Sequence, residues 1–179
     1  MRRHNRLLLT AGLAALTLAG CASDQPVRRA APAPRQPVVI RGIPVRPATY
    51  VATAASIDLY AIKASQIALT RARDAKLRDF ALTEAGAHEG LGSQLSFAGR
   101  RLNLLPSAEL QPEHQRMVET LEFTGDFDAT FRSQQIQVHE AALKLHSDFA
   151  ASGESATLRP VARNAVPIIR AHLTRLRGL

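Results

Sequence analysis

The sequence predicts an all-α protein in which four long helices form an antiparallel bundle. From about residue 48 onward, apolar residues recur at intervals of three and four, the spacing that gives a helix one apolar face. Runs with the two-residue alternation of strands are missing, which argues against alternating strands and helices. Short breaks between the helical segments favour antiparallel neighbours, and about 130 residues suit one domain with its own core.

The first two long helices are predicted over residues 49–71 and 75–102. Asp74 stands directly before the second helix, where its carboxylate can accept a hydrogen bond from a free backbone N–H of the first turn. Glycine is unfavourable inside a helix, yet four glycines are spread along this one, and close packing against a neighbouring helix is the expected reason. They are Gly86, Gly90, Gly92 and Gly99.

A short helix and two further long helices complete the predicted bundle. Pro112 suits the first turn of a short helix that ends near Phe123, because the N–H that proline lacks would have no helical partner there. The last two long helices are predicted over residues 127–151 and 155–177, with a break between them. The short helix therefore lies between the second and third long helices.

A secretory signal peptide is predicted over residues 1–20, and Cys21 is predicted to be the lipidated first residue of the mature chain. A basic start leads into an uncharged apolar run and then into small residues before Cys21. The sequence Leu-Ala-Gly-Cys that ends at Cys21 resembles the bacterial lipobox. Cys21 is the only cysteine, so the chain cannot form an internal disulfide. Because Ala22 follows Cys21, we expect anchoring in the outer membrane, facing the periplasm.

Residues 21–47 are predicted to form an extended tether between the anchor and the bundle. Six of the ten prolines lie in this segment, and proline favours extended chain. Most of the positive charge also precedes the bundle, since residues 1–46 sum to +7 and the remaining residues to +1. The nearly neutral bundle gives no case for nucleic-acid binding. The arginine-rich tether is expected to contact anionic lipid or cell-wall polymer.

Motifs on the four long helices resemble, in their order and spacing, the family named "domain of unknown function 4142". Asp58 stands where the first helix of that family usually has glutamate, and the second motif ends at His88, with Glu84 in place of a methionine. The motifs lie at residues 50–59, 84–88, 127–140 and 166–173. The resemblance covers residues 50–176. It implies a secreted bacterial protein with a ferritin-like bundle over residues 48–179, and it implies no activity.

Polar residues on or beside the apolar stripes of the four long helices point to a metal site inside the bundle. At about 1.5 Å of rise per residue, Asp58 and His88 lie at one level, whereas His139 and His172 are expected about 9 Å apart in level. Imidazoles and carboxylates suit one iron, zinc, copper(II) or manganese ion. The predicted ligands are Asp58, His88, His139 and His172, and the predicted outer partners are Glu84 and Asp128.

The same residues also fit a buried Asp–His network that satisfies its own hydrogen bonds and fixes the register of the helices. Several other kinds of site lack their motifs. A di-iron oxidase needs two Glu-x-x-His pairs, and the chain has none. Copper(I) transport needs soft ligands, and the chain has only two methionines. The helical serines lack a nucleophile elbow, so a hydrolase is not expected.

Two functions remain open on the sequence alone, beside a third possibility, a cell-wall or lipid-binding scaffold that makes its contacts through the arginine-rich tether. The first is a non-enzymatic envelope lipoprotein, a structural, interaction or stress-related module, because no catalytic signature is complete. The alternative is a periplasmic metal-binding or redox protein that uses the Asp and His residues inside the bundle.

Overall fold

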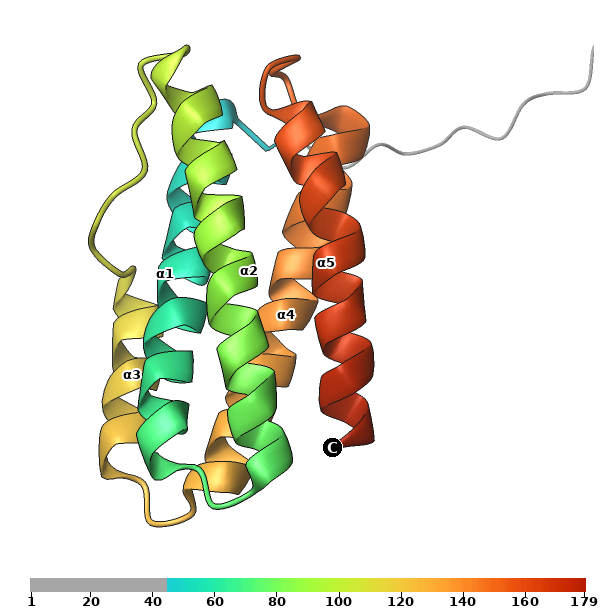
Figure 1. Ribbon diagram of the computed structural model, residues 1–179. Coiled ribbons are helices and arrows are strands. Elements are labelled where there is room, and N and C mark those ends of the chain that lie inside the picture. The colour runs from blue at the N-terminus through green and yellow to red at the C-terminus, as the bar shows by residue number, and fades with distance from the viewer. Residues whose placement is uncertain (1–44) are drawn as a thin grey trace, which may run out of the picture. The chain divides into compact units, whose positions relative to one another are not determined.

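The computed structural model describes residues 45–179, which form five helices and, within that range, no strand (Figure 1). The all-α prediction is therefore confirmed, as is the short helix between the second and third long ones. The helices are α1 (Pro47–Arg71), α2 (Ala75–Arg100), α3 (Pro112–Phe123), α4 (Phe127–Ser152) and α5 (Arg159–Gly178).

The four long helices form two antiparallel hairpins that pack into a bundle. α1 packs chiefly against α2, and α4 packs chiefly against α5, while contacts of α1 with α4 and of α2 with α5 join the two hairpins. The connection over residues 101–111 runs down beside α1 to α3, which lies along the lower half of α1 (Figure 1). A side chain from each long helix can therefore reach the centre of the bundle.

The boundaries of α2 follow from its capping residues. Asp74 accepts a hydrogen bond from the backbone N–H of Lys76 at 2.8 Å, as predicted. At the other end, the N–H of Leu104 donates to the carbonyl of Gly99, and Asn103 takes a φ of 55°. This is a Schellman motif with asparagine in the left-handed position, which asparagine tolerates better than most residues.

The start of α5 differs from the prediction. The helix begins at Arg159 and not at residue 155, because a separate turn over residues 156–158 precedes it. The N–H of Arg159 donates to the carbonyl of Ser155 at 3.0 Å, and Pro160 occupies the first turn of α5, a position that proline favours. The shift moves every residue of α5 along the bundle axis relative to the predicted helix.

Fully buried small residues allow the helices to approach closely. Ala61, Ala64 and Ala68 on α1 and Ala142 on α4 expose none of their surface. Larger apolar side chains, among them Phe80, fill the space between the hairpins. Polar side chains occur inside this apolar core, and they are the residues of the candidate site.

The glycines of α2 are only partly explained by close packing. A Cβ on Gly99 would lie 2.1 Å from the carbonyl oxygen of Leu104, so the loop backbone requires glycine there. A Cβ on Gly86 or Gly90 would meet nothing within 4 Å, and one on Gly92 would make only ordinary contacts. The expectation of close helix packing is therefore wrong for Gly86 and Gly90.

This difference gives a prediction for two alanine substitutions in one helix. We expect Gly86→Ala to raise the free energy of unfolding by about 1 kcal/mol, because alanine is the better helix former and the added methyl group has room. We expect Gly99→Ala to lower it, because the loop backbone would have to move. Urea unfolding of both variants checks this, and a stabilised Gly99→Ala protein would contradict the close approach.

The predicted signal peptide, Cys21 and the tether up to residue 44 lie outside the described residues. Within residues 45–179, no helix has both the length and the apolar character needed to cross a membrane.

Candidate metal centre

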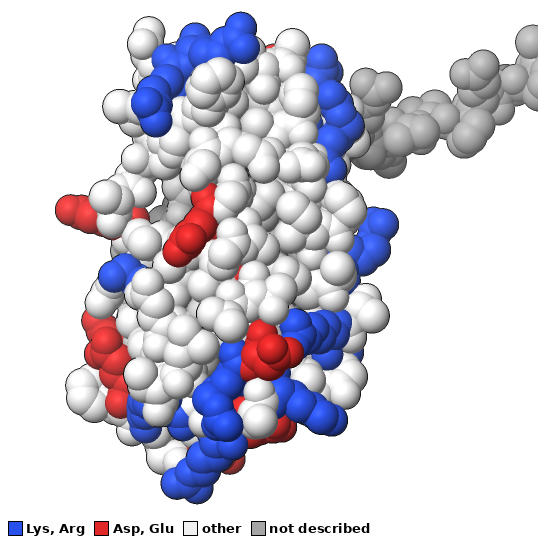
Figure 2. Space-filling model, viewed as in Figure 1, with Lys and Arg blue, Asp and Glu red and all other residues white. Residues whose placement is uncertain are grey.

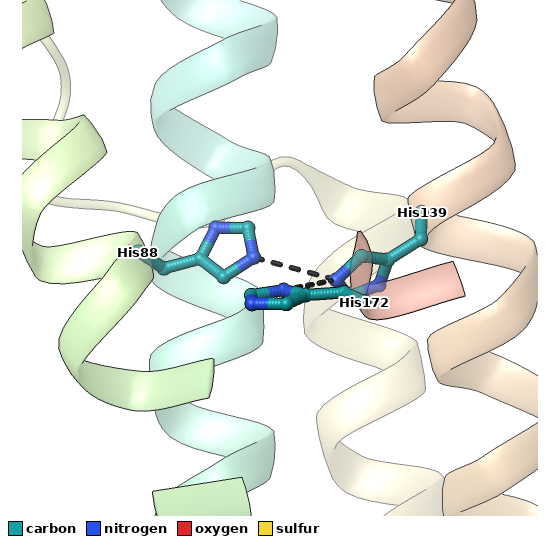
Figure 3. A group of neighbouring side chains, drawn as sticks. All are labelled: His88, His139 and His172. Atoms are coloured by element: carbon teal, nitrogen blue, oxygen red, sulfur yellow. Dashed lines mark hydrogen bonds between the residues drawn. The ribbon is translucent and has the colours of Figure 1, made fainter. Parts of the chain in front are cut away.

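Three buried histidines from three helices converge inside the bundle (Figure 3). His88 comes from α2, His139 from α4 and His172 from α5, and they expose 0%, 1% and 8% of their surface. His88 Nε2 lies 3.4 Å from His139 Nε2, which lies 3.2 Å from His172 Nδ1. The three side chains together offer one ring nitrogen each within 4.8 Å of the other two.

These spacings match those of ligands around one metal ion. Nitrogens bound at about 2.0–2.1 Å to a tetrahedral ion lie about 3.3–3.4 Å from one another. The contacts of His139 with His88 and with His172 already have this spacing. The nitrogens of His88 and His172 lie within 4.8 Å of each other, so these two rings would have to move closer, by up to about 1.5 Å, for all three to bind one ion.

Hydrogen bonds on the far side of two rings point their remaining lone pairs at each other. The Nδ1–H of His88 donates to Asp58 Oδ1 at 2.8 Å, and the Nδ1–H of His139 donates to the carbonyl oxygen of Gln135 at 2.8 Å. A neutral imidazole that donates through Nδ1 has an unprotonated Nε2. Two Nε2 lone pairs then face each other at 3.4 Å, an arrangement that a metal ion between them would satisfy. Without metal, His139 Nε2 can accept from a protonated Nδ1 of His172 at 3.2 Å.

Burial keeps the imidazoles of His139 and His172 uncharged. It lowers the pKa of His139 to about 3, and electrostatic repulsion from His88 acts in the same direction. Burial also lowers the pKa of His172 to about 4, helped by His88 and Arg175. Neutral imidazole is the form that binds metals, so neither ring has to lose a proton before binding at neutral pH.

Glu84 brings a carboxyl group to the same place. Its side chain is fully buried, Oε2 accepts a hydrogen bond from the Ser65 hydroxyl at 2.9 Å, and Oε1 lies 3.5 Å from His139 Nε2. Among the described residues, Oε1 has no hydrogen-bond partner. Burial raises the pKa of Glu84 well above its usual range, although the Ser65 bond acts in the opposite direction. A cation beside Oε1 would favour the ionised carboxylate.

Asp58 lies behind His88 and does not face the other two histidines. Burial raises the pKa of Asp58, while the hydrogen bond and the charge of His88 lower it. A carboxylate that accepts from the far nitrogen of a ligating histidine fixes the tautomer and the orientation of that ring. Asp58 was predicted as a ligand, and the geometry gives it this orienting position instead.

Asp128 lies apart from the three histidines. Its carboxylate accepts hydrogen bonds from the backbone N–H groups of Arg73 and Asp74, at the turn between α1 and α2. It is the second residue of α4, eleven residues or about 16 Å along the helix from His139. Asp128 therefore joins the hairpins at one end of the bundle and is not an outer partner of the histidines.

Two further buried histidines lie outside the cluster. His146 Nδ1 pairs with the Tyr50 hydroxyl at 3.1 Å, and His114 Nδ1 pairs with the Ser56 hydroxyl at 2.7 Å.

Sequence reasoning missed two residues that contact the site. Ser65 lies seven residues after Asp58 on α1, so their shared helix face was the available signal. Gln135 precedes His139 by one helical turn, and its carbonyl orients that ring. The side-chain amide of Gln135 is also fully buried and, within residues 45–179, neither of its polar atoms has a partner.

The fold is similar to that of two solved structures. One is CopM in the Cu(II)-bound form, with a TM-score of 0.66 at 15% identity, covering 76% of this chain and 96% of that one. The other is a DUF305 fragment from Deinococcus radiodurans, with a TM-score of 0.63 at 19% identity, covering 74% of this chain and 93% of that one. At these identities the likeness shows the helical-bundle fold alone.

Comparison with families of known sequence is more specific. No curated protein matches the chain. The family described as "Domain of unknown function (DUF4142)" matches residues 42–179, which include all five helices and the histidine cluster. Because the match spans most of the sequence, the chain belongs to the DUF4142 family.

Proposed function

We propose that this protein binds one divalent transition-metal ion at the centre of the bundle, and copper(II) most tightly. The ligands are His88 Nε2, His139 Nε2 and His172 Nδ1. The convergence of these three buried ring nitrogens, two of them with lone pairs that face each other at 3.4 Å, is the observation that carries the proposal.

A hydrogen-bond network without metal explains the same residues less completely. A second proton on His88 would satisfy the contact with His139, and Asp58 would balance its charge. That arrangement still leaves Glu84 Oε1 without a partner among the described residues, at a fully buried position. Buried polar atoms are rarely left unpaired. A cation between the imidazoles and Glu84 would use all of these groups.

The donor atoms indicate which ions fit. Imidazole nitrogen with one carboxylate oxygen suits copper(II), zinc and related divalent ions, and affinity for such sites generally peaks at copper(II). The three ligand side chains contain no sulfur: Met117 lies on α3 and packs in the apolar core, and the only cysteine of the chain is Cys21. The Cu(II)-bound structure of a protein with the same fold is consistent with this choice.

The proposed role is that of a non-enzymatic metal-holding module in the cell envelope. The ligands are almost inaccessible from solvent, because His88 and His139 expose at most 1% of their surface and His172 exposes 8%. A substrate would therefore have little access to the ion. The predicted lipid on Cys21 would keep the bundle at the membrane, where it would hold the ion on the periplasmic side.

Equilibrium dialysis of tag-free protein against copper(II) and zinc tests the proposal. We expect one ion per chain, with copper(II) retained against a larger concentration of competing chelator than zinc. His146→Ala is the matched control for replacement of His139. Both residues are buried histidines on α4, but His146 lies outside the cluster. Protein that retains no ion, or that retains it equally when the cluster histidines are replaced, would exclude this function.

Replacement of Glu84 by glutamine is expected to separate stability from metal binding. Because burial raises the pKa of Glu84 above its ordinary value of 4.5, ionisation of this carboxyl destabilises the metal-free fold progressively as pH rises from about 4.5 toward the raised pKa. Glutamine carries no charge to ionise and its carbonyl can still accept from Ser65. Metal-free Glu84→Gln protein should therefore have the higher melting temperature, by a margin that grows as pH rises above about 4.5.

The same variant should bind the ion more weakly, because it no longer offers a negative oxygen. We expect a loss of affinity of about 10- to 100-fold, the range typical of groups that support a metal ligand set. Unchanged copper(II) affinity would mean that Glu84 does not face the ion.

A further inference from the structure

A shallow apolar groove lies between the end of α2 and the start of α5, away from the histidines. It has a volume of about 750 Å³, and apolar side chains make up most of its lining. Phe97 and Ala98 form the α2 side, Pro160 and Val161 form the α5 side, and Arg101 lies at the rim. Asn164 donates to the side-chain oxygen of Gln94 at 2.7 Å and joins the two helices beside the groove.

Large apolar side chains are exposed at this end of the bundle. Phe97 exposes 70% of its surface, and Leu105, in the connection that follows α2, exposes 69%. An exposed aromatic ring beside an apolar groove is an unfavourable arrangement in water and favours contact with another apolar phase.

Basic side chains surround these apolar residues. The arginines at this end are Arg46, Arg100, Arg101, Arg159 and Arg163, and they outnumber the acidic residues there, which are Asp148 near the end of α4 and Glu154 in the turn that follows. Figure 2 shows the side of the bundle on which α2 and α5 lie in front. Its upper part is largely uncharged and lies between two groups of basic side chains. The arginines at this end are therefore complementary to an anionic surface, and the apolar side chains between them are complementary to an apolar one.

The chain enters the described domain at this end of the bundle, where α1 begins (Figure 1). Val45, the first described residue, packs there against the apolar cluster that includes Ala98 and Leu158. The preceding chain, which includes the predicted lipidation site Cys21, joins the domain there. A lipid anchor on that chain would keep the domain near a membrane, with this end attached to the tether.

We propose that this end of the bundle docks on a bilayer that contains anionic phospholipid. Phe97 and Leu105 enter the boundary between headgroups and acyl chains, and the surrounding arginines pair with headgroup phosphates. Exposed apolar side chains combined with basic ones are the pattern by which proteins lie on a membrane without spanning it. The docking surface is independent of the metal site.

A single introduced tryptophan tests this docking, because the chain contains no tryptophan of its own. Phe97→Trp protein, prepared metal-free and without the predicted leader and Cys21, is mixed with phosphatidylglycerol vesicles. We expect its fluorescence emission to move to shorter wavelength and to be quenched by brominated acyl chains. The matched control is Phe123→Trp, since Phe123 exposes 85% of its surface at the opposite end of the bundle.

Charge is tested in the same background. Arg101→Gln should weaken vesicle binding about fivefold, the effect expected of one arginine near an anionic surface, whereas Arg73→Gln at the opposite end should not. Pure phosphatidylcholine vesicles should give little shift. Emission unchanged by anionic vesicles in Phe97→Trp, or shifted equally in Phe123→Trp, would overturn the proposal, because binding through the tether alone would leave both tryptophans in water.

Discussion

Replacement of His139 by alanine is expected to remove metal binding almost completely. His139 is the central ligand, because its Nε2 contacts the coordinating nitrogens of both His88 and His172. Loss of one of three ligands should cost more affinity than the roughly 100-fold that follows loss of an outer partner. Isothermal titration calorimetry with copper(II) measures the difference in affinity between the variant and the wild type, and a competing chelator is added for the wild-type protein.

His172→Ala provides a second variant in case the deeply buried His139 position does not tolerate alanine. His172 lies closer to the surface, with 8% exposed, so its removal should disturb packing less. The circular dichroism spectrum of each variant establishes that the bundle has formed. If both folded variants bind copper(II) as tightly as the wild type, the ion occupies another place.

Copper(II) is expected to stabilise the fold strongly. The three ligands come from both hairpins, so an ion would join α2 to α4 and α5 across the interface between them. At a free ion concentration 100-fold above the dissociation constant, binding to the folded state alone adds about 2.7 kcal/mol. For a domain of this size that corresponds to an increase in melting temperature of about 10 °C.

Differential scanning fluorimetry with and without copper(II) measures this increase. His139→Ala protein is the control, because nonspecific effects of the ion on the bundle would remain in it while the specific increase would vanish. A wild-type melting temperature that does not change with copper(II), or that falls equally in both proteins, would contradict a preformed site.

The sequence could predict that Asp58 and His88 lie at the same height along the bundle axis, because the turn between their helices is short. Asp74 caps α2 three residues after α1 ends, so counting residues from that turn gives nearly correct heights. Their hydrogen bond of 2.8 Å agrees with the prediction that they lie at one level.

The separation of about 9 Å expected between His139 and His172 is wrong, and the cause is the start of α5. Thirteen residues separate His139 from the end of α4 at Ser152, and thirteen separate Arg159 from His172, so both rings lie about 20 Å from the connection. The prediction counted the turn over residues 156–158 as part of the helix. Apolar periodicity alone does not distinguish such a turn from a first helical turn.

Ring orientation is the part of the site that sequence could not supply. The direction in which His139 points depends on the carbonyl of Gln135, a backbone atom present at every position. Glu84 was predicted as an outer partner, but its separation from His139 depends on the rotamers of both side chains. Asp128 shares a helix with His139, and the eleven residues between them already correspond to about 16 Å, so its separation from the site could have been predicted from the sequence.

Crystals of the protein grown with copper(II) would test the central claim most directly, through anomalous diffraction at the copper absorption edge. We predict one anomalous peak per chain, about 2.0–2.1 Å from the ring nitrogens of His88, His139 and His172. Solution metal content of one copper per chain should accompany it. A peak at another position, or no peak between the three rings in copper-loaded crystals, would contradict the metal centre.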